Sequence, residues 1–142
     1  RKAKQHREET KRIKILAQKL TVQFAFAANG LFIRPFATAE EVVREGNLQH
    51  HCVGGYTGDY ADERSYLFCI RTEEAPDTPY YTLELDPKTG TVRQYRGYRN
   101  DAPTSGKPDP AAVAFVNKWV KSVVIPQYQK QDKKQAQTQI PA

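Results

Sequence analysis

The stretch YYTLELDPKTGTVRQYRGY, residues 80–98, has the pattern of a β-hairpin. Aromatic and β-branched residues alternate with polar residues over 80–85 and again over 91–98, as expected of strands. The linker 86–90 has proline early and glycine late, which suits a type I turn followed by a left-handed residue. Alternation predicts which side chains share a face of each strand. On the first strand one face carries Tyr80, Thr82 and Glu84. On the second strand one face carries Arg93, Tyr95 and Gly97, and the other carries Gln94, Arg96 and Tyr98.

Two earlier apolar runs extend the hairpin into a sheet. Residues 31–34 form a short apolar run before Pro35, and residues 65–71 are rich in aromatic and branched side chains. Each run is long enough for one strand. The sequence therefore predicts an α+β fold, with an antiparallel sheet of three or four strands packed on one face by helices.

The N-terminal segment has a helical period. Ile13, Leu16, Leu20 and Phe24 recur at intervals of three and four, which predicts one long helix over 7–28 that ends at Asn29-Gly30 and has a break near Thr21. The alternative is a strand over 22–26, where Val22, Phe24 and Phe26 alternate. Two shorter helices follow: one is capped by Thr38 with Glu41 as a capping box and ended by Gly46, and the other is a glycine-weakened helix over 51–62.

The C-terminal helix begins at Asp109-Pro110, an N-cap followed by proline in the first turn. An apolar stripe that includes Trp119 marks it as a core helix, and Pro126 is expected to stop it. The Gln/Lys-rich residues 126–142 are expected to form a disordered tail or linker. The predicted organisation is a basic N-terminal helix over 1–30, an α+β domain over 31–125 and this tail.

Composition restricts the class of protein. The chain has 142 residues and a net charge of +6, but residues 1–20 hold eight Lys/Arg against two Glu, so the basic character belongs to the flanks. No apolar run approaches the roughly 18 residues of a membrane span, and nothing at the start resembles a signal peptide. Two cysteines make no disulfide framework, so we expect a cytoplasmic protein with no membrane association.

The segment Gln49–Tyr56 concentrates the reactive side chains, since it holds two of the three histidines and one of the two cysteines. If a helix begins near Cys52, its free amides stabilise a thiolate there, with His51 or His50 as base. Glu84 interrupts an apolar strand and is the expected orienting or acid group. The alternative is that Cys52 is a small buried side chain and His51 a polar residue with satisfied hydrogen bonds.

Other cofactor chemistries have little support in the spacing. The pairs C-x-x-C and H-x-x-x-H are absent, so a metal site is not expected, and the glycines after Cys52 are not followed by Gly-Lys-Ser/Thr as in a phosphate loop. We therefore predict no metal and no cofactor.

A second polar group follows the hairpin. Gln94 and Arg96 share a strand face and Asn100 lies just beyond, a combination that suits a phosphate, a base edge or a carboxylate. Arg71 joins them or pairs with Glu84. The predicted ligand-binding set is Tyr56, Arg71, Gln94, Arg96 and Asn100. Tyrosines interleaved with arginines over 80–99 also resemble a stacking surface for single-stranded nucleic acid, although tyrosines in hairpins more often pack across the strand pair.

At these residues the chain resembles the PcfJ-like proteins. The matching pattern is Glu45-Gly46 followed by Leu48-x-x-His51-Cys52-Val53-Gly54-x-Tyr56, then an apolar strand ending in Arg71, then Tyr81-Thr82-Leu83-Glu84 and Val92-x-Gln94-x-x-Gly97-x-x-Asn100. The resemblance covers roughly residues 31–125. It implies a protein of bacterial mobile elements, such as conjugative plasmids and phages, associated with DNA transfer or processing. It also implies that His51, Cys52, Glu84, Gln94 and Asn100 form one functional cluster.

Three functions remain open at this point. The first is a nucleic-acid-associated module of a mobile-element protein, with DNA or RNA as partner and phosphate contacts from the basic helix. The second is a hydrolase or transferase with Cys52 as nucleophile and His51 as base. The third is a non-catalytic module that binds protein partners within a larger assembly.

Overall fold

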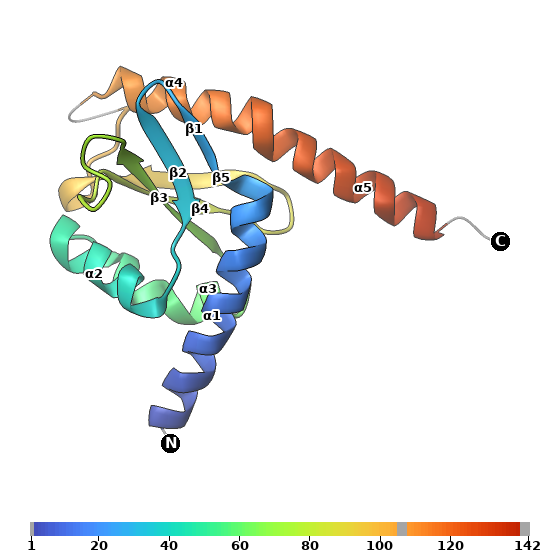
Figure 1. Ribbon diagram of the computed structural model, residues 1–142, viewed down its shortest axis with the longest axis horizontal. Coiled ribbons are helices and arrows are strands. Elements are labelled where there is room, and N and C mark those ends of the chain that lie inside the picture. The colour runs from blue at the N-terminus through green and yellow to red at the C-terminus, as the bar shows by residue number, and fades with distance from the viewer. Residues whose placement is uncertain (1, 105–107, 140–142) are drawn as a thin grey trace.

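The protein folds around one antiparallel sheet of five strands in the order β1-β2-β3-β4-β5, as the computed structural model of residues 2–104 and 108–139 shows (Figure 1). The α+β class is confirmed, and the sheet has one strand more than the upper prediction of four. The elements in chain order are α1 (Lys2–Phe24), β1 (Phe26–Ala28), β2 (Leu31–Pro35), α2 (Ala39–Gln49), the 3₁₀ turn η1 (Cys52–Tyr56), α3 (Thr57–Ala61), β3 (Tyr66–Thr72), β4 (Tyr81–Leu85), β5 (Val92–Arg96), the 3₁₀ turn η2 (Tyr98–Asn100), α4 (Pro110–Trp119), the π-helical turn η3 (Val120–Val124) and α5 (Ile125–Gln139).

The additional strand is β1, and the Asn29-Gly30 dipeptide explains it. Asn29 has φ 54° and Gly30 φ 79°, so both residues are left-handed, as a tight two-residue hairpin turn requires. The pair therefore joins β1 to β2 and does not cap a helix, and Phe26 pairs with Ile33 across the hairpin. The helix expected over 7–28 begins earlier, at Lys2, and ends at Phe24. The strand β1 shares only Phe26 with the alternative strand predicted over 22–26.

Helices cover both faces of the sheet, in contrast to the single covered face that was predicted. α2 and α3 lie on one side and α4 and α5 on the other (Figure 1). The central strand β3 shows why, because Tyr66 to Arg71 are all buried and the strand therefore has covered side chains in both directions.

The face toward α4 is the apolar core. Phe68 of β3 packs edge-on against Trp119, with ring centroids 5.3 Å apart, and against Phe24 at 5.7 Å. Trp119 is fully buried, and its indole N–H donates to the carbonyl of Phe24 at 2.7 Å. This bond ties the end of α1 to α4, so α1 belongs to the same core as the sheet.

The capping box at α2 is confirmed in its first half. The Thr38 hydroxyl accepts from the amide of Glu41 at 3.1 Å, while the Glu41 carboxylate accepts from the amide of Ala37 and from Arg34. The predicted stop at Gly46 is wrong, because α2 continues to Gln49. A Cβ at Gly46 would lie 2.9 Å from the backbone nitrogen of Gly54, so this glycine lets α2 approach η1 closely.

The C-terminal helix does not stop at Pro126. The chain widens into the π turn η3, in which the amide of Ile125 donates to the carbonyl of Val120, and then continues as α5 to Gln139. A widened turn relieves the clash between a proline ring and the preceding carbonyl. α5 extends away from the body (Figure 1), and Tyr128 fixes its first turn by donating to the carbonyl of Pro87 at 2.7 Å. Residues 126–139 are therefore helical, in place of the expected disordered tail.

The single glycine-weakened helix that was predicted over residues 51–62 is divided into two short elements. Residues 51–62 form the turn η1 followed by the short helix α3, with His51 as N-cap of η1.

Within the described residues, no helix combines the length and the hydropathy needed to cross a membrane.

Candidate functional site

One pocket of about 460 Å³ lies between η1, η2 and the sheet face that α2 partly covers. It brings together six of the eight residues predicted from the sequence, namely His51, Tyr56, Glu84, Gln94, Arg96 and Asn100. Its remaining walls are Val53, Leu67 and Thr82. Segments 30 to 50 positions apart in the chain thus converge on one cavity, and the roles assigned to these residues remain predictions.

The strand register explains the convergence. Glu84 of β4 lies between Leu67 of β3 and Gln94 of β5, and Thr82 lies beside Arg96. Directly paired residues on neighbouring strands point to the same face of a sheet. The alternation over residues 80–98 predicted the faces of each strand, and this register places Thr82, Glu84, Gln94 and Arg96 on one surface.

A β-bulge adds Arg93 to this surface. The register shifts between Glu84 and Leu85, because Leu85 pairs with Val92 and leaves Arg93 as the extra residue. The Arg93 guanidinium donates to the Glu84 carboxylate at 3.2 Å and to the Ser65 hydroxyl at 2.9 Å. The prediction that Arg93 and Gln94 face opposite sides is wrong, since the bulge turns both toward Glu84.

Glu84 is the anchor of the pocket floor. One carboxylate oxygen accepts from Ser65 and Arg93, and the other accepts from the Gln94 amide nitrogen at 3.3 Å. Gln94 in turn accepts from Nε of Arg96 at 3.5 Å through its amide oxygen. The charge of Glu84 is balanced by Arg93, and the chain of bonds orients Gln94 and Arg96 toward the cavity.

His51 is held at both ring nitrogens. Nδ1 accepts from the amide of Val53 at 3.4 Å, and Nε2 lies 3.0 Å from the hydroxyl oxygen of Thr82. A ring that accepts at Nδ1 carries its proton on Nε2 and donates it to Thr82. Burial lowers the pKa of His51, which favours this neutral form. In this arrangement His51 has no free lone pair for general base catalysis, and it serves as the cap of η1.

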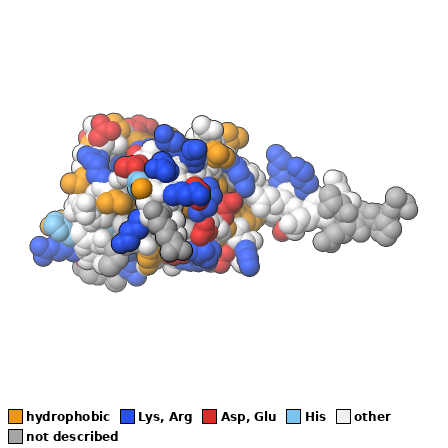
Figure 2. Space-filling view, turned by 90° about the horizontal axis from the view of Figure 1, so that it is seen from below, with side chains coloured by type: hydrophobic (Ala, Val, Ile, Leu, Met, Phe, Trp, Pro, Cys, Tyr) orange, Lys and Arg blue, Asp and Glu red, His pale blue; other side chains and the backbone are white. Residues whose placement is uncertain are grey.

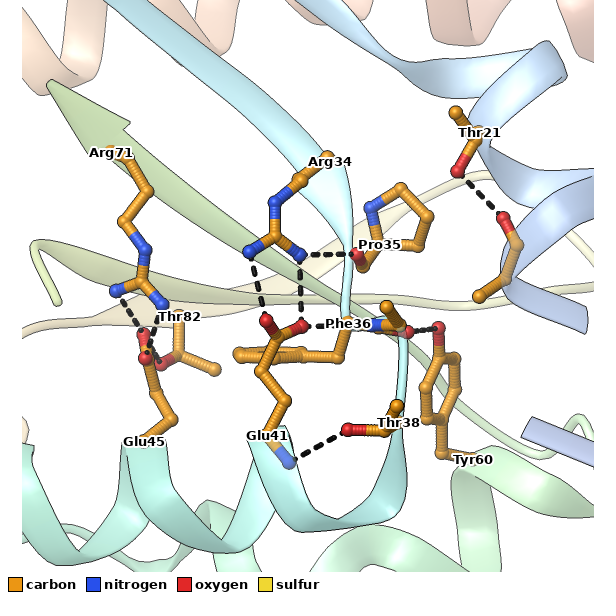
Figure 3. A network of polar contacts seen from close by, with 12 residues as sticks. Thr21, Arg34, Pro35, Phe36, Thr38, Glu41, Glu45, Tyr60, Arg71 and Thr82 are labelled. Atoms are coloured by element: carbon orange, nitrogen blue, oxygen red, sulfur yellow. Dashed lines mark hydrogen bonds and ion pairs between the residues drawn. The ribbon is translucent and has the colours of Figure 1, made fainter. Parts of the chain in front are cut away.

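Behind Thr82 lies a buried ion pair that sequence reading did not find. The Thr82 hydroxyl donates to Glu45 at 3.3 Å, and the Glu45 carboxylate receives both terminal nitrogens of Arg71, at 2.8 and 3.2 Å (Figure 3). The side chains of Arg71 and Glu45 are 2% and 1% exposed. Arg71 therefore does not line the pocket and pairs with Glu45, whereas the sequence had suggested Glu84.

The helical period offered a signal for Glu45. It follows Val42 by three residues and precedes Gln49 by four, and all three are buried along one stripe of α2. Burial raises the pKa of Glu45, and the guanidinium of Arg71 opposes that rise. A carboxylate on the buried stripe of a helix requires a cationic or hydrogen-bonding partner, and Arg71 was an available cation on a strand.

The structure describes the side chain of Cys69 but not that of Cys52. Cys52 begins η1, as predicted for a thiol at a helical start, but its side chain lies outside the described part of the molecule. Cys69 is buried against α2, and burial raises the pKa of its thiol to about 12. Cys69 is therefore not a reactive thiol.

The turn η2 closes the pocket with an unusual backbone. Arg99 has φ 53° and Asn100 φ 63°, so two successive non-glycine residues adopt the left-handed conformation. Bonds from the Asn100 amide to Gly97 at 3.1 Å and from the Gly97 amide to Asp101 at 2.8 Å hold the turn. Strained backbone of this kind clusters at functional sites, and here it presents Asn100 to the cavity.

Comparison with known proteins places the chain in a family. An uncharacterized protein of Listeria innocua serovar 6a is 29% identical over 120 residues, which cover 83% of this chain and 25% of that protein. The chain thus spans about a quarter of the length of this relative. No solved structure matches.

The family match is wider at the N-terminus than the resemblance read from the motifs. It covers residues 1–109, and so it includes α1 and ends at the cap of α4, whereas the motifs suggested roughly 31–125. It contains every residue that lines the pocket. The match over most of its length shows that this chain belongs to the PcfJ-like protein family.

Proposed function

We propose that this domain is a nucleic-acid-associated module of a bacterial mobile-element protein, and that its pocket receives one unpaired nucleotide of a single strand. The observation that carries the proposal is Arg96. Its side chain is half-buried in the pocket wall, and among the described residues its only polar contact is the bond from Nε to Gln94. Among the described residues the terminal nitrogens of this guanidinium form no ion pair, and Glu84, the acidic residue of the same pocket, is held by Arg93; an unpaired guanidinium fork of this kind suits an anionic ligand.

The contrast with the other arginines supports this reading. Arg34, Arg71 and Arg93 also lie on this face of the sheet, and each is paired with a glutamate at 3.2 Å or less. Arginine combines a fixed charge with a planar fork of donors, so it is well suited to a phosphate. Arg96 is the member of this group without an acidic partner in the described chain.

The remaining walls suit a base. Gln94 and Asn100 carry amides that offer both donors and acceptors, which base edges require, and Tyr56 supplies an aromatic ring. A volume of about 460 Å³ falls within the range of roughly 300–1,000 Å³ usual for small-ligand pockets. Apart from Glu84, which Ser65, Arg93 and Gln94 already hold, and His51, which Val53 and Thr82 hold, the lining offers one cation, two amides and the Tyr56 ring, and this mixture favours a nucleotide over a purely apolar ligand.

The surface charge favours a localised site over a broad basic patch. Lys and Arg side chains are interspersed with Asp and Glu on the face seen in Figure 2. On α1, Arg12 pairs with Asp62 at 3.0 Å and Lys19 with Glu63 at 3.7 Å, so part of its basic charge is compensated. Exposed Lys2 and Lys4 at its start form no ion pair within the described residues and are available for phosphate contacts.

The test is binding of fluorescein-labelled 12-nucleotide DNA and RNA strands at low salt, followed by anisotropy. Arg96→Gln should weaken binding about tenfold or more, because one charge-assisted contact to phosphate is lost. The matched control is Arg44→Gln, an exposed arginine of α2 that should bind as the wild type does. Absence of binding to both strands, or equal affinity of the Arg96 variant, would refute the proposal.

A further inference from the structure

A second pocket lies on the other side of η2. It has a volume of about 330 Å³, and its lining includes Tyr80, Tyr81, Tyr98 and Asp109. Asn100 lines the first pocket and Tyr98 the second, so a three-residue turn is the wall between them. The two cavities are therefore neighbours on either side of η2.

The second pocket has an aromatic rim. The Tyr98 side chain is 48% exposed, which is high for a large ring, and His50 contacts it edge-on with centroids 5.2 Å apart. The Arg99 guanidinium lies 5.4 Å from the centre of the same ring. A ring fixed on one edge by His50 and accompanied by a cation is a suitable platform for a base.

The floor of this pocket is rigid. The Tyr80 and Tyr81 rings pack edge-on at 4.6 Å, and both hydroxyls donate to the Asp109 carboxylate, the latter at 3.4 Å. Burial raises the pKa of Tyr81 to about 12, so its hydroxyl stays a neutral donor. A Cβ at Gly97 would lie 3.1 Å from the Tyr81 ring and 3.2 Å from the carbonyl of Tyr80, so the absence of a side chain lets η2 rest on this floor.

From this arrangement we infer that the strand continues across η2, with a second nucleotide stacked on Tyr98 and Arg99 beside the linking phosphate. This inference rests on the proposed function of the first pocket. Arg96 on one side of the turn and Arg99 on the other place cations along the path that joins the two cavities. The left-handed backbone of Arg99 and Asn100 places Asn100 in the wall of the first pocket and leaves the Arg99 guanidinium beside the Tyr98 ring.

The test is competition against a fluorescein-labelled 12-nucleotide thymidine strand by thymidine 5′-monophosphate and by the dinucleotide pTpT. In the wild type the dinucleotide should compete at least tenfold better than the mononucleotide. Tyr98→Ala should remove most of that ratio, since one stacked base is worth roughly 5- to 100-fold. Tyr98→Phe should preserve the ratio, because the ring remains.

The outcomes separate the two claims. A mononucleotide that competes as well as the dinucleotide, or a ratio unchanged by Tyr98→Ala, would overturn the second subsite and leave the first intact. Failure of both competitors to displace the strand would overturn the two-pocket path together with the nucleotide pocket. Thermal melts of the Tyr98 variants exclude a folding defect, because this ring is exposed at the surface.

Discussion

On one face of the sheet β3 presents Phe68 to Trp119, and on the other face the same strand presents Arg71 to Glu45. Both faces are buried at this strand, yet the first is held by ring packing and the second by charged hydrogen bonds. Apolar burial stabilises a fold in proportion to area, whereas a buried ion pair contributes little net stability after desolvation. The comparison indicates that the apolar face supports the fold and the polar face orients the pocket.

The polar face forms a continuous chain of bonds. It runs from Arg71 through Glu45 and Thr82 to His51, and the last two line the cavity. The buried carboxylate has a fixed position because two guanidinium nitrogens and one hydroxyl hold it. Such a chain fixes the geometry of side chains that would otherwise rotate.

The largest effect is expected from breaking the apolar face. Trp119→Ala should lower the free energy of unfolding by about 4–5 kcal/mol, since it removes a fully buried ring and its bond to the Phe24 carbonyl. Urea denaturation measures the change. Trp119→Phe, which keeps a ring, should cost clearly less, and equal losses for the two variants would argue against packing as the cause.

A smaller loss is expected from breaking the polar face. Arg71→Ala should cost about 3 kcal/mol, because it leaves the Glu45 carboxylate buried without its cation. The matched control is Arg12→Ala, whose ion pair with Asp62 is about half exposed and should contribute roughly 0–1 kcal/mol. Similar losses for the two arginines in urea denaturation would contradict the distinction.

A double substitution sharpens this comparison. Arg71→Met with Glu45→Leu should recover most of the stability lost in Arg71→Ala, since no unpaired charge remains in the interior. Binding of the labelled strand should nevertheless stay weaker than in the wild type, because Thr82 loses the partner that fixes it. Wild-type affinity in the double variant would show that the ion pair does not orient the pocket.

The smallest expected effect is a pH dependence of the free energy of unfolding, caused by His51 on the polar face. The pKa of His51 is lowered in the folded state, so the unfolded chain takes up a proton near pH 6.5 while the folded chain stays neutral. Stability from this residue is therefore complete above about pH 6.5 and is lost as pH falls through the folded pKa. Denaturation from pH 7.5 to 5 should show a slope that His51→Asn removes.

The control for this slope is His6 of α1. His6 has a side chain that is 63% exposed, beside Glu40 at 3.6 Å, so His6→Asn should leave the slope almost unchanged. If the slope disappears in the His6 variant and persists in the His51 variant, the prediction that His51 causes the pH dependence is wrong.

Local sequence determined the parts of this fold that depend on neighbours in the chain. Alternation over 80–98 gave both strands and the shared face of Thr82 and Glu84, and the caps at Thr38 and Asp109 gave the starts of α2 and α4. These features follow from the period of the strand and from the unpaired amides of a helix start. They required no knowledge of distant residues.

The tertiary structure decided what these faces meet. Asn29-Gly30 reads equally as a helix stop or a hairpin turn, and only the pairing of β1 with β2 selects the hairpin. Arg71 could pair with either of two glutamates, and the packing of α2 against the sheet brings Glu45 to it, while the bulge at Arg93 occupies Glu84. Spacing along the chain specifies the direction of a side chain, but its partner depends on which distant element packs over it, and that choice belongs to the whole fold.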